Sequence, residues 1–508
     1  MRNLRFTLII GLTLLGGTSC THNKVQWVSS TFENPWLEMV ISADDAKPAG
    51  TVVIDRTKTL QEVEGFGTCF NELGWTSLSL LSEEDRGSVI RDLFSAEGLG
   101  LTMARMPIGA NDFSVDYYSY DDVPGDLALE HFSIDHDRAT LIPFIKAAQA
   151  VNPDLKVWAS PWCPPQWMKV NGHYANTSTL PIKRRFEEMM ASRKNRPDDV
   201  RATGGSSFGL NPAMLEDNGL PEDQQIREGQ DAFRLEEEYL DAYARYFGKF
   251  IDAYREKGID IRMVMPQNEP NSAQWYPACT WTPEGLARFI AHLGPEMEKR
   301  GVEVFLGTIE RADPEMWERI LRDENAGKWI HGLGFQWAGK DALPELHRMH
   351  PEFPCYQTEQ ECGNGRNDWA GALRAWDLLK HYFKNGVSGY FYWNTSLMEG
   401  GVSTWGWTQN SLVTVSTEDK TYRYTPEYYI LKHASHFVKS GAKVLDLAGD
   451  WEDALGFLNP DGGIVLLLGN KDTAGKVIRI EVSGKMLAVN LPAGSVNTVV
   501  LQSGMSRH

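Results

Sequence analysis

The segment IRMVMPQNEP, residues 261–270, joins a short run of apolar residues to the polar group Asn268-Glu269-Pro270. Such a run has the length of a buried strand, and the asparagine and proline mark its end. Seven similar runs alternate with helical patterns over about 330 residues. The eight expected strands are Glu62–Phe70, Leu101–Ile108, Leu155–Trp162, Ile261–Gln267, Val302–Thr308, Gly332–Trp337, Pro354–Glu359 and Gly389–Asn394. This alternation predicts an α/β fold, a (β/α)8 TIM barrel around a parallel sheet.

The expected helices between these strands have recognisable start signals. Ser82 stands three residues before Asp85, which is a capping pattern. Thr282-Pro283-Glu284 and Asp313-Pro314-Glu315 each offer a capping side chain, a proline at the first helical position and an early acid. Residues 231–254 repeat apolar side chains at helical spacing. These signals support the alternation of strands and helices.

One connection is much longer than an ordinary loop between a strand and a helix. Residues 163–230 are polar and rich in glycine, proline and charged side chains. At the carboxyl face of a barrel such a loop shapes the active site, but a partly helical surface insertion has the same composition. The sequence leaves both interpretations open.

The pattern changes after residue 412. Short alternating strands separated by turns follow, at Gly456–Asn459, Ile464–Gly469, Val477–Val482, Leu487–Leu491 and Ser495–Leu501. They predict an attached antiparallel β-sandwich, to which the segment Thr51–Arg56 offers a further strand. The expected organisation is therefore a sandwich segment at 21–60, the barrel at 61–412 and the β-sandwich domain at 413–508.

The N-terminus, residues 1–20, has the proportions of a signal peptide. Arg2 and Arg5 precede the apolar run Phe6–Leu15, and small residues lead to Cys20. Gly17-Thr18-Ser19-Cys20 resembles a loose lipoprotein signal, in which the cysteine becomes the lipid-bearing first residue; a plain export signal is the alternative. We expect an exported protein, periplasmic or at the cell surface, whose membrane contact is a lipid anchor at Cys20.

The composition argues against several classes of protein. The 508 residues have a net charge of −18, which disfavours a nucleic-acid partner and attraction to an anionic membrane surface. Five cysteines follow Cys20, without a CxxC pair, so neither a dense disulfide framework nor a structural zinc site is expected. No metal or organic cofactor is implied. The 17 tryptophans offer flat apolar surfaces for the C–H faces of sugars, although most are expected in the core.

Functional side chains in such a barrel lie where the strands end, at its carboxyl face. Four expected strands end in polar or aromatic groups, at Ser160-Pro161-Trp162, Gln267-Asn268-Glu269-Pro270, Thr358-Glu359-Gln360-Glu361 and Tyr392-Trp393-Asn394. Glycoside hydrolysis needs this combination, because one carboxylic acid protonates the leaving oxygen while a second carboxylate attacks the anomeric carbon or activates water. The sequence therefore predicts Glu269 and Glu359 as a catalytic pair.

Two other motifs are weaker candidates for chemistry. Gly205-Ser206-Ser207-Phe208-Gly209 fits the pattern of a nucleophile elbow but lacks the strand before it and the helix after it. His347 and His350 stand three residues apart on an expected helix, a spacing that could hold a metal but that surface histidines also show.

From about Gly65 to its end, the chain resembles glycoside hydrolase family 30, the family of glucosylceramidases and β-1,6-glucanases. The resemblance lies in Gly65-Phe66-Gly67, in ASPWCPPQWMK at 159–169, in Asn268-Glu269-Pro270, in NPDG at 459–462 and in PAGS at 492–495. It implies a retaining β-glycosidase with a carbohydrate substrate.

The resemblance also implies a role for each matching residue. Glu269 would be the general acid/base and Glu359 the nucleophile, with Glu361 as the competing assignment. The implied substrate-binding residues are Glu72, Arg105, Trp162, Asn268, Trp337 and Trp393. Arg105 would support the nucleophile by charge-assisted hydrogen bonds, a purely structural ion pair being the alternative. Glu72 would stand where glucosylceramidases have an aspartate that holds sugar hydroxyls.

Two departures from the family's pattern bear on the substrate. Gln336 and Ala338 stand where glucosylceramidases have histidine and tyrosine, which argues against ceramide-linked substrates. We expect a β-glucosidase or a β-1,6-glucanase; the alternatives are a β-fucosidase, a β-xylosidase or a non-catalytic carbohydrate-binding lipoprotein. The sugar, its leaving group, exo or endo action, the oligomeric state and the membrane face of the anchor are left open.

Overall fold

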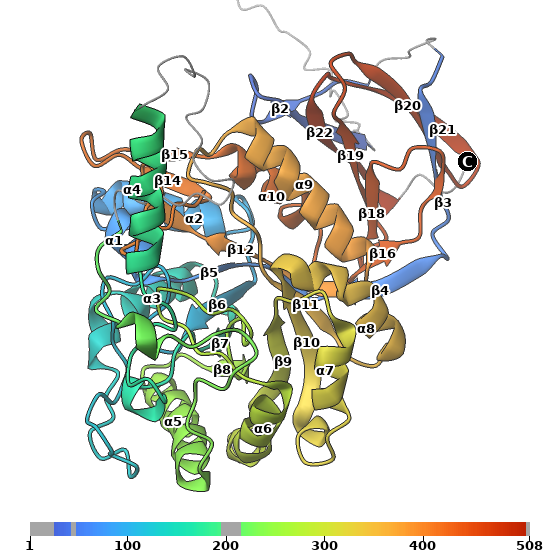
Figure 1. Ribbon diagram of the computed structural model, residues 1–508. Coiled ribbons are helices and arrows are strands. Elements are labelled where there is room, and N and C mark those ends of the chain that lie inside the picture. The colour runs from blue at the N-terminus through green and yellow to red at the C-terminus, as the bar shows by residue number, and fades with distance from the viewer. Residues whose placement is uncertain (1–24, 42–46, 195–214, 504–508) are drawn as a thin grey trace, which may run out of the picture.

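The computed structural model describes residues 25–41, 47–194 and 215–503. Eight parallel strands close into a barrel in the order β10-β11-β12-β5-β6-β7-β8-β9, in the lower part of Figure 1. They are β5 (Gly65–Cys69), β6 (Met103–Pro107), β7 (Lys156–Ser160), β8 (Ile261–Val264), β9 (Glu303–Ile309), β10 (Ile330–Gln336), β11 (Cys355–Glu359) and β12 (Val387–Asn394). The TIM barrel is confirmed, and each of the eight expected strands is present with slightly different ends.

At least one helix follows each barrel strand. The helices are α1 (Glu72–Leu78), α2 (Glu83–Phe94), α3 (Leu141–Val151), α4 (Leu180–Lys194), α5 (Glu237–Glu256), α6 (Pro283–Glu298), α7 (Pro314–Leu321), α8 (Leu343–Met349), α9 (Trp369–Lys384) and α10 (Pro426–Ser435). The start signals at Ser82, Thr282 and Asp313 are confirmed, since each side chain accepts a hydrogen bond from a backbone N–H in the first turn.

The long connection at 163–230 is partly helical in its described residues, where it forms α4 and short 3-10 turns. Lys169 anchors its beginning. This fully buried side chain donates to the carbonyl oxygen of Ala278 at 2.6 Å and to three oxygens of the insertion itself. The motif at 205–209 lies outside the described residues.

The second domain is a sandwich of two sheets, at the upper right of Figure 1. The larger sheet has the order β2-β1-β22-β19-β18-β16-β4, and the smaller has the order β17-β3-β20-β21. The strands are β1 (Val25–Ser30), β2 (Leu37–Glu38), β3 (Gly50–Ile54), β4 (Thr59–Val63), β16 (Ala442–Leu445), β17 (Ala448–Gly449), β18 (Ala454–Leu458), β19 (Ile464–Asn470), β20 (Lys476–Val482), β21 (Lys485–Leu491) and β22 (Ser495–Leu501). The expected strand at 51–56 is β3. It pairs with β20 in parallel, so the sandwich is not antiparallel throughout.

The strands of the sandwich begin later than expected from the sequence. Residues directly after 412 form β14 (Val413–Val415), which pairs with β13 (Ser396–Met398) and β15 (Tyr422–Tyr424) in a small separate sheet. Helix α10 follows and packs against α9 of the barrel. The boundary expected at 412–413 therefore differs from the structure, because β14 pairs with a strand that directly follows β12.

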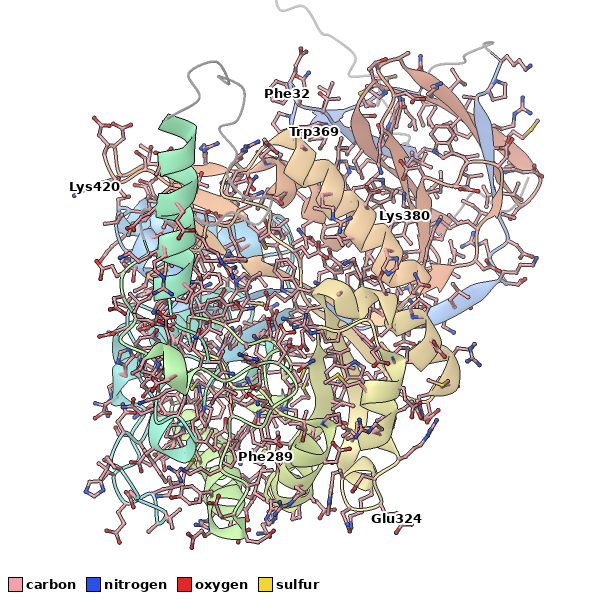
Figure 2. All side chains as sticks on the ribbon, viewed as in Figure 1. Phe32, Phe289, Glu324, Trp369, Lys380 and Lys420 are labelled. Carbon is pink, nitrogen blue, oxygen red and sulfur yellow. The ribbon has the colours of Figure 1, made fainter. Side chains whose placement is uncertain are left out.

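Helix α9 lies between the barrel and the sandwich (Figure 1). The Trp369 indole donates to the carbonyl of Gly494 at 3.1 Å, and the Trp376 indole donates to Asp453 Oδ1 at 2.9 Å. Lys380 forms an ion pair with the same aspartate, and Figure 2 labels Trp369 and Lys380 along this helix. These contacts join the two domains.

No helix in the described part of the chain is long and apolar enough to cross a membrane. The expected signal peptide at 1–20 and the lipid anchor at Cys20 lie outside the described residues and stay predictions. The five cysteines of the described chain are buried, and none forms a disulfide with another.

His433 on α10 ties the helix to the sandwich and provides a test by pH. Its two ring nitrogens lie 2.8 Å from the hydroxyl oxygens of Ser30 and Thr498. Burial, with a smaller effect from Lys432, lowers the pKa of His433 to about 3. Because an unfolded histidine has a pKa of about 6.5, stability from the neutral ring is present above that pH and is lost below it.

We expect the free energy of unfolding of the wild type to fall by about 2 kcal/mol through His433 alone between pH 7 and pH 5. The variant His433→Gln keeps a donor and an acceptor between the two hydroxyls but does not titrate, so its unfolding free energy should change less. Urea unfolding of both proteins at both pH values measures the difference. Equal losses in the two proteins would contradict this account of His433.

Candidate active site

Glu269 follows β8 at the carboxyl end of the barrel, in a strained backbone conformation. Its φ is +48°. Such left-handed values cost a residue with a side chain about 1–3 kcal/mol and concentrate at functional sites. The Glu269 N–H donates to Thr308 Oγ1 at 3.0 Å, and the Thr308 N–H donates to the carbonyl of Gln267 at 2.7 Å. These two bonds to β9 hold the strained conformation.

Arg105 on β6 lies fully buried within this face of the barrel and fixes the groups around it. Its guanidinium donates to Glu359 Oε2 at 3.0 Å, to Asn268 Oδ1 at 2.7 Å and to Ser160 Oγ at 2.9 Å. Glu359 ends β11, Ser160 ends β7 and Asn268 precedes Glu269. One cation on β6 therefore holds side chains from three other segments of the barrel, among them β11 across the barrel.

Gln336, the last residue of β10, bridges the two carboxylates. Its Nε2 donates to Glu269 Oε1 at 2.9 Å and to Glu359 Oε2 at 3.1 Å. Its Oε1 accepts from Thr358 Oγ1 at 2.9 Å and from Arg105 at 3.3 Å, which turns the amide donor toward the carboxylates. Because they share one nitrogen, these two carboxylate oxygens lie within about 6 Å of each other, close to the ~5–5.5 Å between the carboxyl groups of retaining glycosidases.

The two carboxyl groups differ in their electrostatic surroundings. Burial raises the pKa of both Glu269 and Glu359. The Arg105 guanidinium, paired with Glu359 at 3.0 Å, lowers the pKa of that group in turn. Among the described residues, Glu269 has no ion-pair partner. Burial still holds the pKa of Glu359 at about 7 despite this cation. The ion pair with Arg105 favours the ionised form of Glu359 over that of Glu269, so a shared proton is favoured on Glu269.

Three tryptophans lie around the ion pair of Arg105 and Glu359. The rings of Trp162 and Trp393 stack with centroids 5.1 Å apart, and the Arg105 guanidinium lies 4.4 Å from the Trp162 ring. The Trp337 indole donates to Glu359 Oε1 at 3.3 Å, and its backbone also has a left-handed φ of +46°. The structure thus brings Arg105, Asn268 and all three expected tryptophans to the carboxylate pair.

A cavity of about 450 Å³ opens beside Glu269. This volume is within the range of about 300–1,000 Å³ typical of small-molecule sites. Its lining includes Glu269, Tyr276, Glu310, Trp337, Lys340 and Trp407. Of these six residues, only Glu269 was predicted from a strand-end motif and only Trp337 from the family resemblance. Tyr276, Lys340 and Trp407 lie in connections whose paths depend on the fold, and Glu310 directly follows β9.

Comparison with known families matches both domains of the chain. Residues 63–185 and 212–438 match the glycosyl hydrolase family 30 TIM-barrel domain, and residues 441–499 match the glycosyl hydrolase family 30 beta sandwich domain. The chain belongs to glycosyl hydrolase family 30. The family resemblance, the barrel with its attached sandwich and the expectation of a glycoside hydrolase are confirmed.

Two relatives with different named activities are similar to this chain along most of its length. The lysosomal acid glucosylceramidase of Mus musculus is 25% identical over 475 residues, 87% of this chain and 82% of the relative. Endo-1,6-beta-D-glucanase neg1 of Aspergillus fumigatus is 25% identical over 472 residues, 87% of this chain and 86% of the relative. The solved structure of SrfJ from Salmonella typhimurium has the same fold, with a TM-score of 0.77 and 23% identity over 94% of this chain and 99% of its own.

The hydrogen bonds of Glu72 go to residues other than the carboxylate pair and Arg105. Its Oε1 lies 2.9 Å from His136 Nε2 and accepts from Thr140 Oγ1 at 3.1 Å, while its Oε2 accepts from the Val115 N–H at 2.9 Å. Both carboxylate oxygens thus have partners in the segment that joins β6 to α3. Glu72 fixes that segment, and its role in sugar binding stays a prediction.

Asp112 is a candidate functional residue that the sequence reasoning missed. It lies a few residues beyond β6, is 4% exposed, and its Oδ1 is buried without a hydrogen-bond partner. Burial raises the pKa of Asp112, and the carboxylates of Glu359 and Glu269 raise it further. The indole N–H of Trp393 is likewise buried without a partner. Applying the strand-end rule to β6 as well would have found this aspartate.

Glu361, the competing candidate for the nucleophile, lies on the wall of the cavity. Its carboxylate forms ion pairs with Lys340 and Arg374, each at 2.9 Å. Burial alone would raise the pKa of Glu361, but the two cations prevail and lower it. This geometry favours Glu359, which shares the bridging amide of Gln336 with Glu269.

The two histidines considered as metal ligands lie apart from this site. His350 contacts Glu318, and the His347 ring lies 3.8 Å from the sulfur of Cys355. Within the described ranges, no cluster of three histidine, cysteine, aspartate or glutamate side chains could hold a metal ion.

The substitution Arg105→Met is expected to lower the free energy of unfolding by about 3–5 kcal/mol at pH 8, because Glu359 is then buried without a counter-ion. Removing the cation raises the pKa of Glu359, so the loss should shrink at pH 5, where Glu359 takes up a proton. Denaturant unfolding at both pH values measures this.

The matched control is Arg300→Met, which removes a more exposed cation paired with Asp252 and Glu296. Arg300→Met should lower the free energy of unfolding by less than Arg105→Met does. If Arg105→Met destabilises the protein equally at pH 5 and pH 8, the charge of Glu359 is not what Arg105 compensates.

Proposed function

We propose that the protein is a retaining β-glycosidase that acts on β-linked, glucose-like sugars by double displacement, with Glu269 as general acid/base and Glu359 as nucleophile. The observation that supports this best is the pair itself. The two carboxylates share the Nε2 donor of Gln336, and only Glu359 has a cation, Arg105.

In the first step the ionised Glu359 attacks the anomeric carbon of the sugar. The bond from this carbon to the leaving-group oxygen breaks, and Glu269 transfers its proton to that oxygen. The product is a leaving group with a new hydroxyl and a sugar joined to Glu359 as an ester. Loss of its proton leaves Glu269 as a carboxylate.

In the second step Glu269 acts as the base. It takes a proton from a water molecule, whose oxygen attacks the anomeric carbon and displaces the carboxylate of Glu359. The sugar is released with its original configuration, and both glutamates return to their starting protonation states. Arg105 and Gln336 act by holding Glu359 in place and by stabilising its negative charge.

Recognition of the sugar is assigned to polar groups beside this pair. Asn268 Oδ1 accepts from Arg105 at 2.7 Å and from Thr308 at 3.2 Å, so its Nδ2 is available to donate to a sugar hydroxyl. The Oδ1 of Asp112 and the indole N–H of Trp393 are buried without partners, and each can bind a further hydroxyl.

A glucose-like sugar is supported by the names of relatives. One is a glucosylceramidase and another an endo-1,6-beta-D-glucanase, both of which refer to glucose units. The test must still distinguish glucose from fucose, xylose and galactose, because the recognised hydroxyls differ among these sugars by one group or by its orientation.

The wild type is expected to hydrolyse one member of a panel of aryl β-glycosides made of glucoside, fucoside, xyloside and galactoside. Glu359→Gln should lower kcat by at least about 10⁴-fold, because the attacking carboxylate is gone. Glu269→Gln should lower kcat by about 10²–10⁴-fold on substrates with poor leaving groups. The loss should be far smaller on nitrophenyl glycosides, because the nitrophenolate group departs without protonation. Steady-state kinetics with Glu345→Gln, a substitution of an exposed glutamate on α8, provides the control.

Two results would overturn these assignments. Turnover by Glu359→Gln at the wild-type rate would remove Glu359 as nucleophile, and complete loss in Glu361→Gln with activity kept in Glu359→Gln would transfer that role to Glu361. A wild type that binds β-glucosides but turns over no glycoside would instead favour a carbohydrate-binding protein.

The variant Asp112→Asn is expected to lower kcat/KM by about tenfold, the loss that corresponds to about one hydrogen bond to a sugar hydroxyl. A deoxy substrate that lacks the contacted hydroxyl should lose little further activity in this variant. Asp116→Asn, an exposed position in the same loop, is the matched control. Activity of Asp112→Asn within twofold of the wild type would exclude Asp112 from sugar recognition.

A further inference from the structure

The cavity beside Glu269 lies on one side of the carboxylate pair. Its lining includes Glu269 but, among the described residues, not Glu359, Asp112 or Trp393. In a double displacement the sugar ring contacts the nucleophile, and the leaving group departs beside the acid that protonates it. The cavity is therefore on the side of the leaving group.

We propose that this cavity is the binding site of the leaving group and that it selects a second sugar ring over a lipid chain, with Glu310 as the residue that recognises hydroxyl groups of that ring. The inference rests on the proposed function, because it takes Glu269 as the proton donor. Beyond that function, the proposal names the chemical class of the leaving group and one residue that determines specificity for it.

Glu310 directly follows β9 and is 2% exposed. Its Oε1 accepts from the Asn271 N–H at 2.8 Å, whereas its Oε2 is buried without a hydrogen-bond partner. Burial raises the pKa of Glu310 to about 8; the charge of Glu269 adds to this rise and that of Arg311 opposes it. At neutral pH Glu310 is therefore an uncharged acid, which offers a hydroxyl ligand both a donor and an acceptor.

The other charged side chains of the cavity already have partners. Lys340 lies 2.9 Å from Glu361, and Arg311 lies 2.5 Å from Glu228. An alkyl chain in the cavity would remove these ion pairs from water and leave Glu310 without a partner, which costs free energy. A ring with hydroxyl groups satisfies Glu310 instead.

Aromatic side chains supply the apolar part of the same cavity. Trp337, Tyr276 and Trp407 line it, and the last two have ring centroids 6.4 Å apart. Trp275 supports Trp407 edge-on at 5.6 Å. Flat aromatic surfaces next to hydrogen-bonding groups fit a sugar ring, which has apolar C–H faces and a polar rim.

The test compares the wild type, Glu310→Leu and Glu310→Gln on three substrates with one sugar and different leaving groups: a β-1,6-linked glucose disaccharide, octyl β-glucoside and nitrophenyl β-glucoside. The wild type should have a kcat/KM for the disaccharide at least about tenfold above that for octyl glucoside. Glu310→Leu should lower the disaccharide value about tenfold and leave the other two within about twofold. The kcat/KM of Glu310→Gln for the disaccharide should lie between those of the wild type and Glu310→Leu, because the amide still accepts from the Asn271 N–H and can donate to a hydroxyl.

Two kinetic outcomes would overturn the proposal. An equal loss on all three substrates in both variants means that Glu310 acts through Glu269 and not on the leaving group. A wild type that prefers octyl glucoside to the disaccharide means that the cavity takes an alkyl chain.

A binding measurement separates this proposal from the proposed function. Calorimetric titration in the Glu359→Gln background, where no turnover is expected, should show about tenfold weaker binding of the disaccharide after Glu310→Leu and unchanged binding of octyl glucoside. A wild type that hydrolyses none of the substrates would refute the proposed function alone. An unchanged affinity for the disaccharide in this titration would refute the leaving-group site alone.

Discussion

Arg105 places a full positive charge inside the barrel, and the arrangement of the site follows from the need to compensate it. A buried guanidinium is costly unless its donors meet acceptors of suitable geometry. Here Glu359, Asn268 and Ser160 meet those donors from three directions, at 2.7–3.0 Å. Because each acceptor comes from a different segment of the barrel, the ion brings strand ends that are distant in sequence into one rigid group.

The Arg105 guanidinium also gives the carboxyl groups of Glu269 and Glu359 different electrostatic surroundings. Glu359 lies against Arg105, whereas Glu269 meets only neutral donors among the described residues, chiefly the amide of Gln336. In a dry site this difference favours a proton on Glu269 over one on Glu359. The left-handed backbone of Glu269 and the orphaned Oδ1 of Asp112 are local costs that the scaffold tolerates. Both unfavourable features lie where the proposed function requires the sugar to be bound, so the local cost in stability falls on residues that the reaction uses.

The scaffold around this group is joined at two places to the sandwich. Helix α9 contributes Trp369 and Trp376, and α10 contributes His433, which lies between hydroxyl groups of β1 and β22. These contacts are distant in the chain, so the sandwich supports the outer helices of the barrel rather than the catalytic face. The open cavity lies at that face beside Glu269, where the connections that follow β8, β9, β10, β11 and β12 supply its charged and aromatic lining.

The sequence by itself determined the eight strands, the helix starts at Ser82, Thr282 and Asp313, and the strand-end glutamates, because these depend on local patterns of apolar residues, caps and breaks. The hydrogen-bond partners of Glu72 and the unpaired Oδ1 of Asp112 could not be predicted from the sequence, because both depend on the path of the chain after β6. The tertiary structure alone decided that Gln336 bridges the two glutamates, that β14 pairs with β13 outside the sandwich, and that Glu310 faces a cavity. The bridge and the cavity bring together segments far apart in the chain, which meet only when the barrel closes. The pairing of β14 with β13 depends on the path of the chain after β12.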